Sequence, residues 1–581
     1  MFCSTPGAFA DKEKHPKSHK PSEPSMSNTP LPTLPLGLAS FPLLRQKGRL
    51  YVDKTDLLQK LVETGDYYFL SRPRRFGKSL TISTLEAMFQ GKSEFFAGLA
   101  AENWVKKVSQ HPNPVFCLDF SAFDSSGNTQ DLCNWLNRKL VAFAESHEIC
   151  TSSEKSPAET FDKVISLVRQ KKGLLSLLID EYDAPLLDNL HDLVKISAFR
   201  DILRQFYKAI KACSSSLHFI MITGISKFTK VGIFSAANNL NDISADSTYS
   251  TLNGYTQDEL EKYFSDFIDD AVSQKIAETR QKLLERIRNY YDGFSFDGRT
   301  KVYNPFSLLN FFREYRFSNY WYESGSVSFI ESYFKTHHIA SPETYHLIKV
   351  KTTALAAREI EEARPESFLL QAGYLTIAEA CDDTLVLDYP NQEVLNALSE
   401  MYLTSIYQIP NYNTVGQRLW ESVRKGDMTS LANELNSAIA SLPYHDFSQE
   451  QKRAKEISQD SKRDESFYRS LLLMLLRGAG LQAHGEIPSC RGRSDVLITS
   501  SERIVIIEFK LARTAKEIAN KRREGEAQIL ASGYLEPYRT GNIPVSYAVF
   551  VVDAQKRQIV FDAQAEILGQ TPGSRPEREN C

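Results

Sequence analysis

Residues 65–90 have the sequence GDYYFLSRPRRFGKSLTISTLEAMFQ, which predicts a strand, a loop and a helix in succession. The run 67–70 is aromatic and aliphatic, as in a short buried strand, and the residues after it include Pro73 and Gly77, which favour a loop. From Ser79 onward the apolar residues recur at helical spacing. A strand, a loop and a helix in this order are the context that a phosphate-binding loop requires.

The end of this loop carries the residue types that bind phosphate. Gly77, Lys78 and Ser79 supply a helix start with open N–H groups, an ammonium group for the outer phosphates and a hydroxyl ligand for Mg²⁺. The spacing GxxxxGK[ST] places Arg72 where the first glycine is expected. We predict a nucleotide site, with a basic helix start as the alternative. The predicted binding residues are Arg72, Pro73, Arg74, Arg75, Phe76, Gly77, Lys78 and Ser79.

The arginines of the loop have two interpretations. They either add positive charge around the phosphates, or one of them pairs with Asp183 and holds the loop closed. The sequence does not choose between these interpretations.

A second segment, KKGLLSLLIDEYDAP at 171–185, predicts a buried parallel strand that ends in two acids. In a phosphate-loop ATPase, Asp180 would bind the Mg²⁺ shell and Glu181 would polarise the attacking water. The alternative is an acidic strand end that begins a turn. A further apolar strand at 217–222 is followed by Thr223, which we predict as a sensor of the terminal phosphate, although a threonine at a strand end is usually structural.

The C-terminal part contains a second candidate site. ESFYRSLLLMLLRGAG predicts a helix with Glu465 near its beginning, and GRSDVLITSSERIVIIEFK predicts two strands with Asp495 in the first and Glu508 and Lys510 in the second. A period of two places Glu508 and Lys510 on one face of the strand. Two carboxylates on adjoining strands can bind Mg²⁺ or Mn²⁺, and a neighbouring lysine can orient the water that attacks a phosphodiester. The alternative is a structural ion pair.

Several stretches carry a resemblance to a known family. The sequence resembles the predicted AAA-ATPase-like proteins that carry a C-terminal PD-(D/E)XK nuclease-superfamily domain, over about residues 36–560. In that family RPRRFGKS is the normal loop, so Arg72 is a family trait. The matching stretches are YVDKTDLL, FLSRPRRFGKSL, VFCLDFS, LLIDEYDAPL, TGISKF, IFSAANNLNDIS, YYDGFSFDG, VYNPFSLLNFF, YWYESGS, LLQAGYLTI and YPNQEVL.

The resemblance implies a set of roles. It implies ATP binding by Lys78 and Ser79, with Asp180 and Glu181 opposite, and it does not imply hydrolysis. In the C-terminal domain it implies a metal-dependent nuclease site. The implied residues of that site are Glu465, Asp495, Glu508, Lys510 and Gln528, with Asp495 and Glu508 as the metal ligands.

We therefore expect an α/β protein with a phosphate-loop domain built on a parallel sheet, a helical middle and a C-terminal α/β domain of the restriction-endonuclease type. In the middle, FLLQAGYLTIAEA and LVLDYPNQEVL predict a small hairpin followed by a helix, as in a winged helix. Six aromatic residues of the same region are predicted to pack in a core and not to stack on nucleic-acid bases. They are Tyr291, Phe294, Phe296, Tyr303, Phe306 and Trp321. The expected boundaries are a disordered leader 1–35, the AAA-like domain 36–250, a helical lid 251–400, a helical connector 401–454, the nuclease-like domain 455–560 and a disordered tail 561–581.

The composition of the chain bears on its compartment and on the kinds of partner that it binds. No apolar run among the 581 residues approaches the ~18–20 that cross a bilayer, which predicts no membrane partner. Eight cysteines without CxxC pairs favour a reducing, intracellular compartment. The net charge is −3, and residues 451–560 hold 19 Lys and Arg against 13 Asp and Glu. This local excess indicates either a C-terminal domain that faces a polyanion or an ordinary scatter of charge between domains.

The favoured function is an ATP-binding ATPase coupled to a Mg²⁺- or Mn²⁺-dependent nuclease that acts on DNA or RNA. One alternative is a nucleotide-dependent scaffold whose nuclease fold is catalytically silent, and another is ATP-driven remodelling without cleavage. A homo-oligomer is possible because AAA-type sites are often completed by an arginine of a neighbouring subunit. The sequence does not identify that arginine.

Overall fold

The computed structural model describes residues 31–65, 67–227, 240–323, 330–331, 333–334, 341–355, 363–409, 412–441, 463–489, 492–500, 502–538, 543–561 and 564–567. The predicted leader, apart from 31–35, and most of the predicted tail lie outside the described residues. Within the described ranges, no helix combines the length and the apolar character needed to cross a bilayer.

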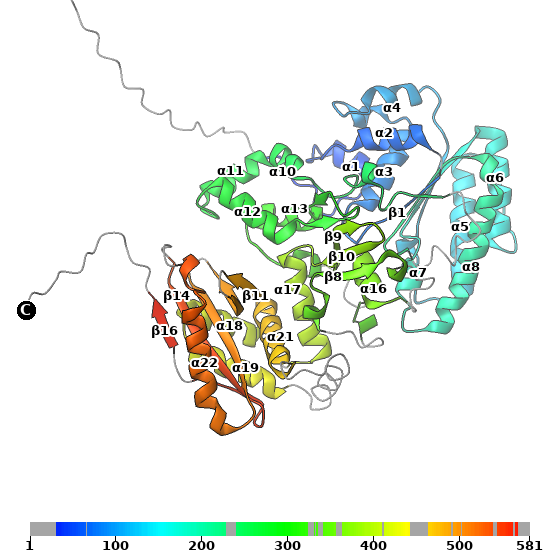
Figure 1. The fold of residues 1–581 in the computed structure, drawn as a ribbon. Helices are drawn as coiled ribbons and strands as arrows, with labels where there is room; N and C mark the ends of the chain where they lie inside the picture. The colour runs from blue at the N-terminus through cyan, green and yellow to red at the C-terminus, as the bar shows by residue number, and fades with distance from the viewer. Residues whose placement is uncertain are drawn as a thin grey trace, which may run out of the picture. The chain divides into compact units, whose positions relative to one another are not determined.

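A five-stranded parallel sheet forms the first part of the chain (Figure 1). Its order is β2-β3-β4-β1-β5, and every neighbouring pair is parallel. The carboxyl ends of parallel strands meet at one edge of a sheet, so the loops after β1, β3 and β4 lie together. The strands are β1 Tyr67–Ser71, β2 Val115–Asp119, β3 Leu175–Asp180, β4 Leu217–Gly224 and β5 Asn241–Asp242.

Helices cover both faces of this sheet, because its strands are apolar on both sides. One core contains α5 Thr129–Ser146, α6 Pro157–Lys172 and α8 Leu193–Ala212. The other core contains α1 Phe41–Gln46, α2 Thr55–Thr64, α3 Lys78–Phe89 and α4 Glu102–Val108. The strands and the helix that the sequence predicted around the phosphate loop are confirmed, with ends that differ by one or two residues.

The middle of the chain is helical and then forms a small sheet. Five helices share one core: α10 Gln257–Tyr263, α11 Ser265–Ser273, α12 Arg280–Tyr291, α13 Pro305–Glu314 and α14 Tyr320–Glu323. An antiparallel sheet of order β8-β10-β9 surrounds α16 Pro365–Ala372 in the sequence: β8 Ile348–Lys351 precedes this helix, and β9 Thr376–Cys381 and β10 Thr384–Asp388 follow it. The predicted hairpin and the helix after it, α17 Gln392–Met401, are confirmed.

One detail of this prediction was wrong. The stretch FLLQA belongs to α16 and not to a strand, because Gly373 ends the helix in the left-handed conformation at φ 87°. Of the six aromatic residues, Tyr291, Phe294, Tyr303 and Trp321 are at most 4% exposed, which confirms their core role.

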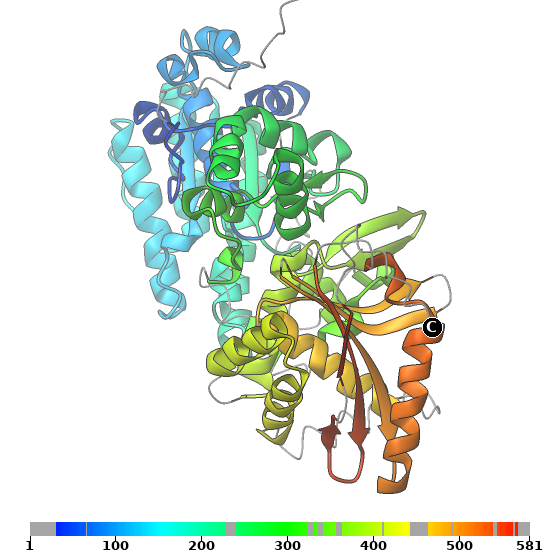
Figure 2. The same ribbon diagram turned by 90° about the vertical axis from the view of Figure 1, so that its left-hand side faces the viewer.

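The C-terminal part is a mixed sheet of order β11-β12-β13-β14-β15, with β16 also paired to β14 (Figure 2). Alternate residues of β12 and β13 separate onto two cores, one under α21 and one under α22. Two further helices, α18 Tyr412–Lys425 and α19 Met428–Ser441, precede it. The elements are α21 Arg463–Gly478, β11 Gln482–Ser489, β12 Gly492–Thr499, β13 Ile504–Ala512, α22 Ile518–Ala531, β14 Val545–Asp553, β15 Gln558–Val560 and β16 Gln564–Ile567. The α/β fold class is therefore confirmed.

Candidate functional site

The phosphate loop joins β1 to α3. Gly77 is in the left-handed region at φ 86° and precedes the first residue of the helix, so the chain turns there without the strain that a side chain would add. Lys78 is 4% exposed and donates hydrogen bonds to the carbonyls of Arg72 and Pro73, both at 3.1 Å. Burial lowers the pKa of Lys78, and the acids at 180, 181 and 183 oppose this shift. The lysine thus lies inside its own loop, held by carbonyls that an anion could replace.

Arg72 lies in the interior, not in the cavity at the loop. Its guanidinium donates to the carbonyls of Ser71 and Ser244 at 2.9 and 2.7 Å, and it lies 4.0 Å from the ring centroid of Phe296. Burial lowers its pKa to about 9, which leaves the side chain charged at neutral pH. Arg72 therefore fastens the beginning of the loop through contacts that a glycine could not make.

The acids after β3 form a connected group with the end of β4. Asp180 accepts a short hydrogen bond from the Thr223 hydroxyl and one from the backbone N–H of Glu181 at 3.0 Å. Burial raises the pKa of Glu181, whose backbone is also left-handed at φ 48°. Thr223 thus positions Asp180, and Glu181 is the acid of this group that reaches the cavity described below.

Asp183 is not paired with Arg72. It accepts hydrogen bonds from the backbone N–H groups of Ile225 and Ser226 and from the Ser226 hydroxyl at 2.8 Å. Burial raises the pKa of Asp183 despite these donors. The carboxylate therefore pins the segment after β4 to the segment after β3.

A cavity of about 600 Å³ opens beside the loop. Four segments make most of its wall: 35–58, 74–84, 252–255 and 305–309. Its lining includes the charged and polar side chains of Arg74, Arg75, Lys78, Ser79 and Glu181 and leucine side chains such as Leu38, Leu50 and Leu309. A lining with both charged and apolar side chains suits a ligand with both phosphates and a flat apolar group, and the volume is in the range of small-molecule sites.

The middle region also packs directly against the residues of the loop. The Phe76 ring packs edge-on against Phe294 and Phe296, at 4.8 and 5.5 Å between centroids. The Trp321 indole N–H donates to the Arg74 carbonyl at 3.2 Å. Gly373 lies so close that a β-carbon there would be 2.6 Å from Pro73 Cβ. Most residues of RPRRF therefore contact the middle region as well as the cavity.

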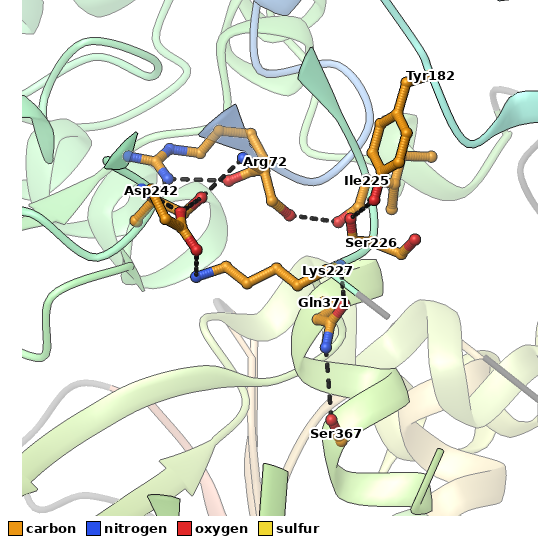
Figure 3. A network of polar contacts seen from close by, with 10 residues as sticks. Arg72, Tyr182, Ile225, Ser226, Lys227, Asp242, Ser367 and Gln371 are labelled. Carbon is orange, nitrogen blue, oxygen red and sulfur yellow. Dashed lines mark hydrogen bonds and ion pairs between the residues drawn. The ribbon is translucent and has the colours of Figure 1, made fainter. Parts of the chain in front are cut away.

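A polar network extends the same connection (Figure 3). Ser244, whose carbonyl accepts from Arg72, donates to Asp242, and Asp242 lies 3.5 Å from the Lys227 ammonium group. The Lys227 backbone N–H then donates to the Gln371 side chain of α16 at 2.5 Å. The beginning of the loop, at Arg72, is thus linked to α16 by consecutive polar contacts.

The second candidate site lies where β12 and β13 diverge. Their pairing ends at Val496 and Ile507, while β12 continues beside β11 and β13 continues beside β14. The same register places Asp495 opposite Glu508, just past the last pair. Because side chains alternate along a strand, Lys510 shares the face of Glu508, as predicted.

The carboxylates at this fork differ in their partners. Asp495 Oδ2 accepts the Phe509 N–H at 2.8 Å. Glu508 is 1% exposed; its Oε1 is 2.8 Å from the Lys510 ammonium group, whereas its buried Oε2 accepts no hydrogen bond from any described residue. Burial, and then the charge of Asp495, raise the pKa of Glu508 to about 7.

A divalent cation fits this pair of carboxylates. No cluster of three or more histidine, cysteine or acidic side chains able to hold a metal occurs among the described residues. Mg²⁺, however, is often bound by only one or two carboxylates, together with water and substrate oxygens. The unpartnered Glu508 Oε2 beside Asp495 supplies the oxygen and the negative charge that such a cation requires.

The other predicted members of this site have different positions. Gln528 on α22 donates to the Tyr534 hydroxyl at 3.2 Å, and Tyr534 donates to the Arg493 carbonyl at 2.6 Å. Glu465 belongs to α21, but its side chain lies outside the described residues. Arg469, one turn further along α21, contacts Asp495 and Glu486.

Replacing Glu508 with glutamine is expected to stabilise the metal-free protein at pH 8. The pKa of Glu508 is raised from 4.5 to about 7, so between these pH values the folded state binds a proton that the unfolded chain releases. The stabilisation that comes from this proton is complete below pH 4.5 and is lost as the pH rises through about 7. Glutamine resembles the protonated acid. We expect the Tm of the variant to exceed that of the wild type by about 2–6 °C at pH 8, and by much less at pH 4.5.

The measurement is thermal unfolding in EDTA across this pH range. Glu502→Gln, in the turn between the same strands, is the control and should show no pH-dependent difference. A Tm gap for Glu508→Gln that is the same at pH 4.5 and pH 8 would contradict the assignment.

Sequence reasoning missed two groups of residues. The segment 35–58 forms a wall of the cavity, but no binding role was predicted for it, although YVDKTDLL at 51–58 is one of the stretches that carry the family resemblance. Arg469 could have been found, because it follows Glu465 by four residues and so lies on the same face of the helix.

Comparisons with known proteins give matches for the two parts of the chain that contain these candidate sites. Residues 35–234 match the family described as predicted AAA-ATPase, and residues 463–562 match the PD-(D/E)XK nuclease superfamily. An uncharacterized protein in the vnfD 5′ region of Azotobacter chroococcum mcd 1 is 31% identical over 543 residues, which cover 91% of this chain and 98% of that protein.

The similarity of this chain to solved structures is weak. The Aeropyrum pernix Orc1 protein in complex with DNA is similar over 76% of this chain and 88% of its own, with 11% identity and a TM-score of 0.23. Cdc6p from Pyrobaculum aerophilum is similar over 65% of this chain and 96% of its own, with 10% identity and a TM-score of 0.21. Scores this low carry no conclusion about fold or function.

Proposed function

Because the chain belongs to the predicted AAA-ATPase family whose members carry a C-terminal PD-(D/E)XK nuclease-superfamily domain, we propose that it is a nucleotide-gated, metal-dependent nuclease. ATP binds at the phosphate loop, and a phosphodiester of DNA or RNA is cleaved at the fork of β12 and β13. The observation that carries the catalytic half is the buried Glu508 Oε2, which no N–H or O–H donor of the described residues reaches, while the Glu508 carboxyl contacts the carboxyl group of Asp495. A buried carboxylate oxygen is costly unless a proton or a cation balances it.

At the phosphate loop, Lys78 exchanges the carbonyls of Arg72 and Pro73 for phosphate oxygens. Ser79 and Asp180 would hold Mg²⁺, with Asp180 oriented by Thr223, and Glu181 would polarise a water molecule. Arg74 and Arg75 add positive charge to the cavity lining. The leucines of the same lining accommodate the base.

At the fork, Asp495 and Glu508 would hold a divalent cation, which would supply Lewis acidity for attack on the phosphodiester. Lys510 is 7% exposed, and its ammonium group is oriented by Glu508 at 2.8 Å. In this proposal Lys510 orients the attacking water and balances charge on the phosphate. Glu465 and Gln528 complete the site from α21 and α22.

Contacts between the two halves support gating. The Trp321 backbone N–H and the Ser307 hydroxyl both donate to Glu393 on α17, at 2.8 and 2.9 Å. Trp321 also donates to the loop carbonyl of Arg74, and α17 packs against α21 in one hydrophobic core. A shift of the loop on ATP binding would thus reach the helix that carries Glu465 and Arg469 through packed and hydrogen-bonded groups.

Tryptophan emission should report ATP binding through Trp321. Its indole is 4% exposed and hydrogen-bonded to the loop, so rearrangement of the Arg74 peptide changes its environment. We expect ATP to change the emission of the wild type and of Trp420→Phe, whereas Trp321→Phe loses most of the change and still binds ATP within about threefold of the wild-type Kd. A signal that persists in Trp321→Phe and disappears in Trp420→Phe would place the responsive element elsewhere.

Cleavage of supercoiled plasmid and of single-stranded DNA and RNA by the purified protein, with Mn²⁺ or Mg²⁺, tests the catalytic proposal. Strand breaks that require the cation support it. Tight nucleotide retention without strand breaks or phosphate release would favour the scaffold. ATP hydrolysis without strand breaks would favour remodelling.

A further inference from the structure

Arg469 occupies a position in the nuclease-like site that the predicted residue set does not explain. Its guanidinium Nη2 lies 2.7 Å from Glu486 Oε1, and Nη1 lies 3.4 Å from Asp495 Oδ1. The other oxygen of Asp495 already accepts the Phe509 N–H. The arginine therefore faces the Asp495 oxygen that does not accept this backbone N–H.

A cation bound to Asp495 changes the balance of charges around Arg469. The aspartate then shares its negative charge with the metal, and the metal repels the guanidinium at short range. Glu486 still holds Arg469 near the fork, so the arginine remains while one of its anionic partners is lost. A planar guanidinium in this situation is suited to an oxyanion with two acceptor oxygens, and a phosphodiester supplies one.

The positions of these side chains allow Arg469 to exchange Asp495 for a phosphodiester. The side chains of Arg469 and Asp495 are 21% and 14% exposed, so the ion pair borders solvent. Glu486 has a left-handed backbone at φ 50° within β11, an unfavourable conformation for a non-glycine residue. It is flanked by Gly485 and Ile487, which pair with Val496 and Ser494, so Glu486 lies across from Asp495. Its carboxylate is thus directed to the arginine from the strand next to Asp495.

We propose that Arg469 is a positioning residue that pairs with Asp495 in the metal-free protein and, when the cation binds, transfers to a phosphodiester oxygen of the substrate while Glu486 retains it. This inference rests on the proposed nuclease function. It adds a residue that binds the substrate. It also explains why Arg469 contacts the Asp495 carboxylate in the metal-free protein. A merely structural role, in which the ion pairs fasten α21 to β11 and β12, makes a different prediction for metal binding.

The test is Arg469→Met in the full-length protein without nucleotide, measured by two binding assays. Removing the competing cation should strengthen Mn²⁺ binding by calorimetry about tenfold, because an opposing charge close to the site is lost. The same variant should bind a short labelled DNA duplex, or an RNA duplex of the same sequence, about tenfold more weakly in Ca²⁺. Opposite changes in the two affinities support the proposal. Weakening of both, or no change in either, overturns it.

Controls separate this inference from the proposed function. Arg493→Met removes an exposed arginine that also approaches Glu486, at 3.6 Å, and should leave Mn²⁺ binding within about twofold. Arg469→Lys keeps the charge without the planar group, so it should keep the wild-type Mn²⁺ affinity and recover only part of the nucleic-acid binding. If the wild type does not cleave but the two affinities shift in opposite directions, the nuclease proposal fails and the role of Arg469 stands. If the wild type cleaves and the affinities do not shift, the role of Arg469 fails alone.

Discussion

Replacing Lys78 with alanine is expected to weaken ATP binding by about 100-fold or more. The ammonium group lies inside the loop, 4% exposed, and its bonds to the carbonyls of Arg72 and Pro73 are of the kind that phosphate oxygens replace. A hydrogen bond between charged groups contributes up to about 3 kcal/mol, and each ~1.4 kcal/mol changes the Kd tenfold. The Kd of a fluorescent ATP analogue measures this change.

The control is Lys92→Ala, just beyond the other end of α3, which should leave the Kd within about twofold. Thermal unfolding of both variants establishes that the fold persists. ATP binding by Lys78→Ala at wild-type affinity would show that the loop is structural and that the cavity serves another ligand.

Replacing Asp495 with asparagine is expected to lower the rate of metal-dependent cleavage by about 1,000-fold. Asparagine has the same shape and can still accept the Phe509 N–H through its carbonyl, so the strand fork should be preserved. It lacks the negative charge that binds the cation, and the metal's contribution of several kcal/mol to the transition state is lost with it. The nicking rate of supercoiled plasmid in Mn²⁺ measures the loss.

Asp553→Asn is a matched control. Asp553 is buried on the neighbouring β14, where its carboxylate accepts the N–H groups of Gln555 and Lys556 in a turn, away from the fork. It should cleave at nearly the wild-type rate. Equal losses in the two variants would indicate damage to the sheet, and an unchanged rate in Asp495→Asn would remove this residue from the site.

The sequence predicted the elements with the strongest local patterns. The strand, loop and helix around Lys78 and the apolar strand ending at Asp180 were found because buried parallel strands are nearly continuous apolar runs. The boundary at Gly373 was missed, because the short apolar run FLLQAGYL is compatible with either a helix or a strand. The left-handed conformation of the glycine that ends α16 is a property of the folded chain.

The candidate sites were predicted less completely, because residue type does not fix the direction of a side chain. Arg72 has the charge of a phosphate-binding residue, but in the fold it is directed toward Ser244 and Phe296. Glu508 and Lys510 were placed on one face by the strand period alone. Arg469 approaches Asp495 only because α21 packs across the fork, a tertiary contact that no local pattern contains.

The most direct test of the central claim, that nucleotide binding controls the nuclease site in the same chain, is the plasmid-nicking rate in Mn²⁺ with and without ATP, for the wild type beside Lys78→Ala. We expect ATP to change the wild-type rate by about tenfold, within the usual range of coupling between sites, and to leave the rate of Lys78→Ala at its nucleotide-free value. A wild-type rate that does not respond to saturating ATP, or an equal response in a variant that no longer binds ATP, would contradict the account.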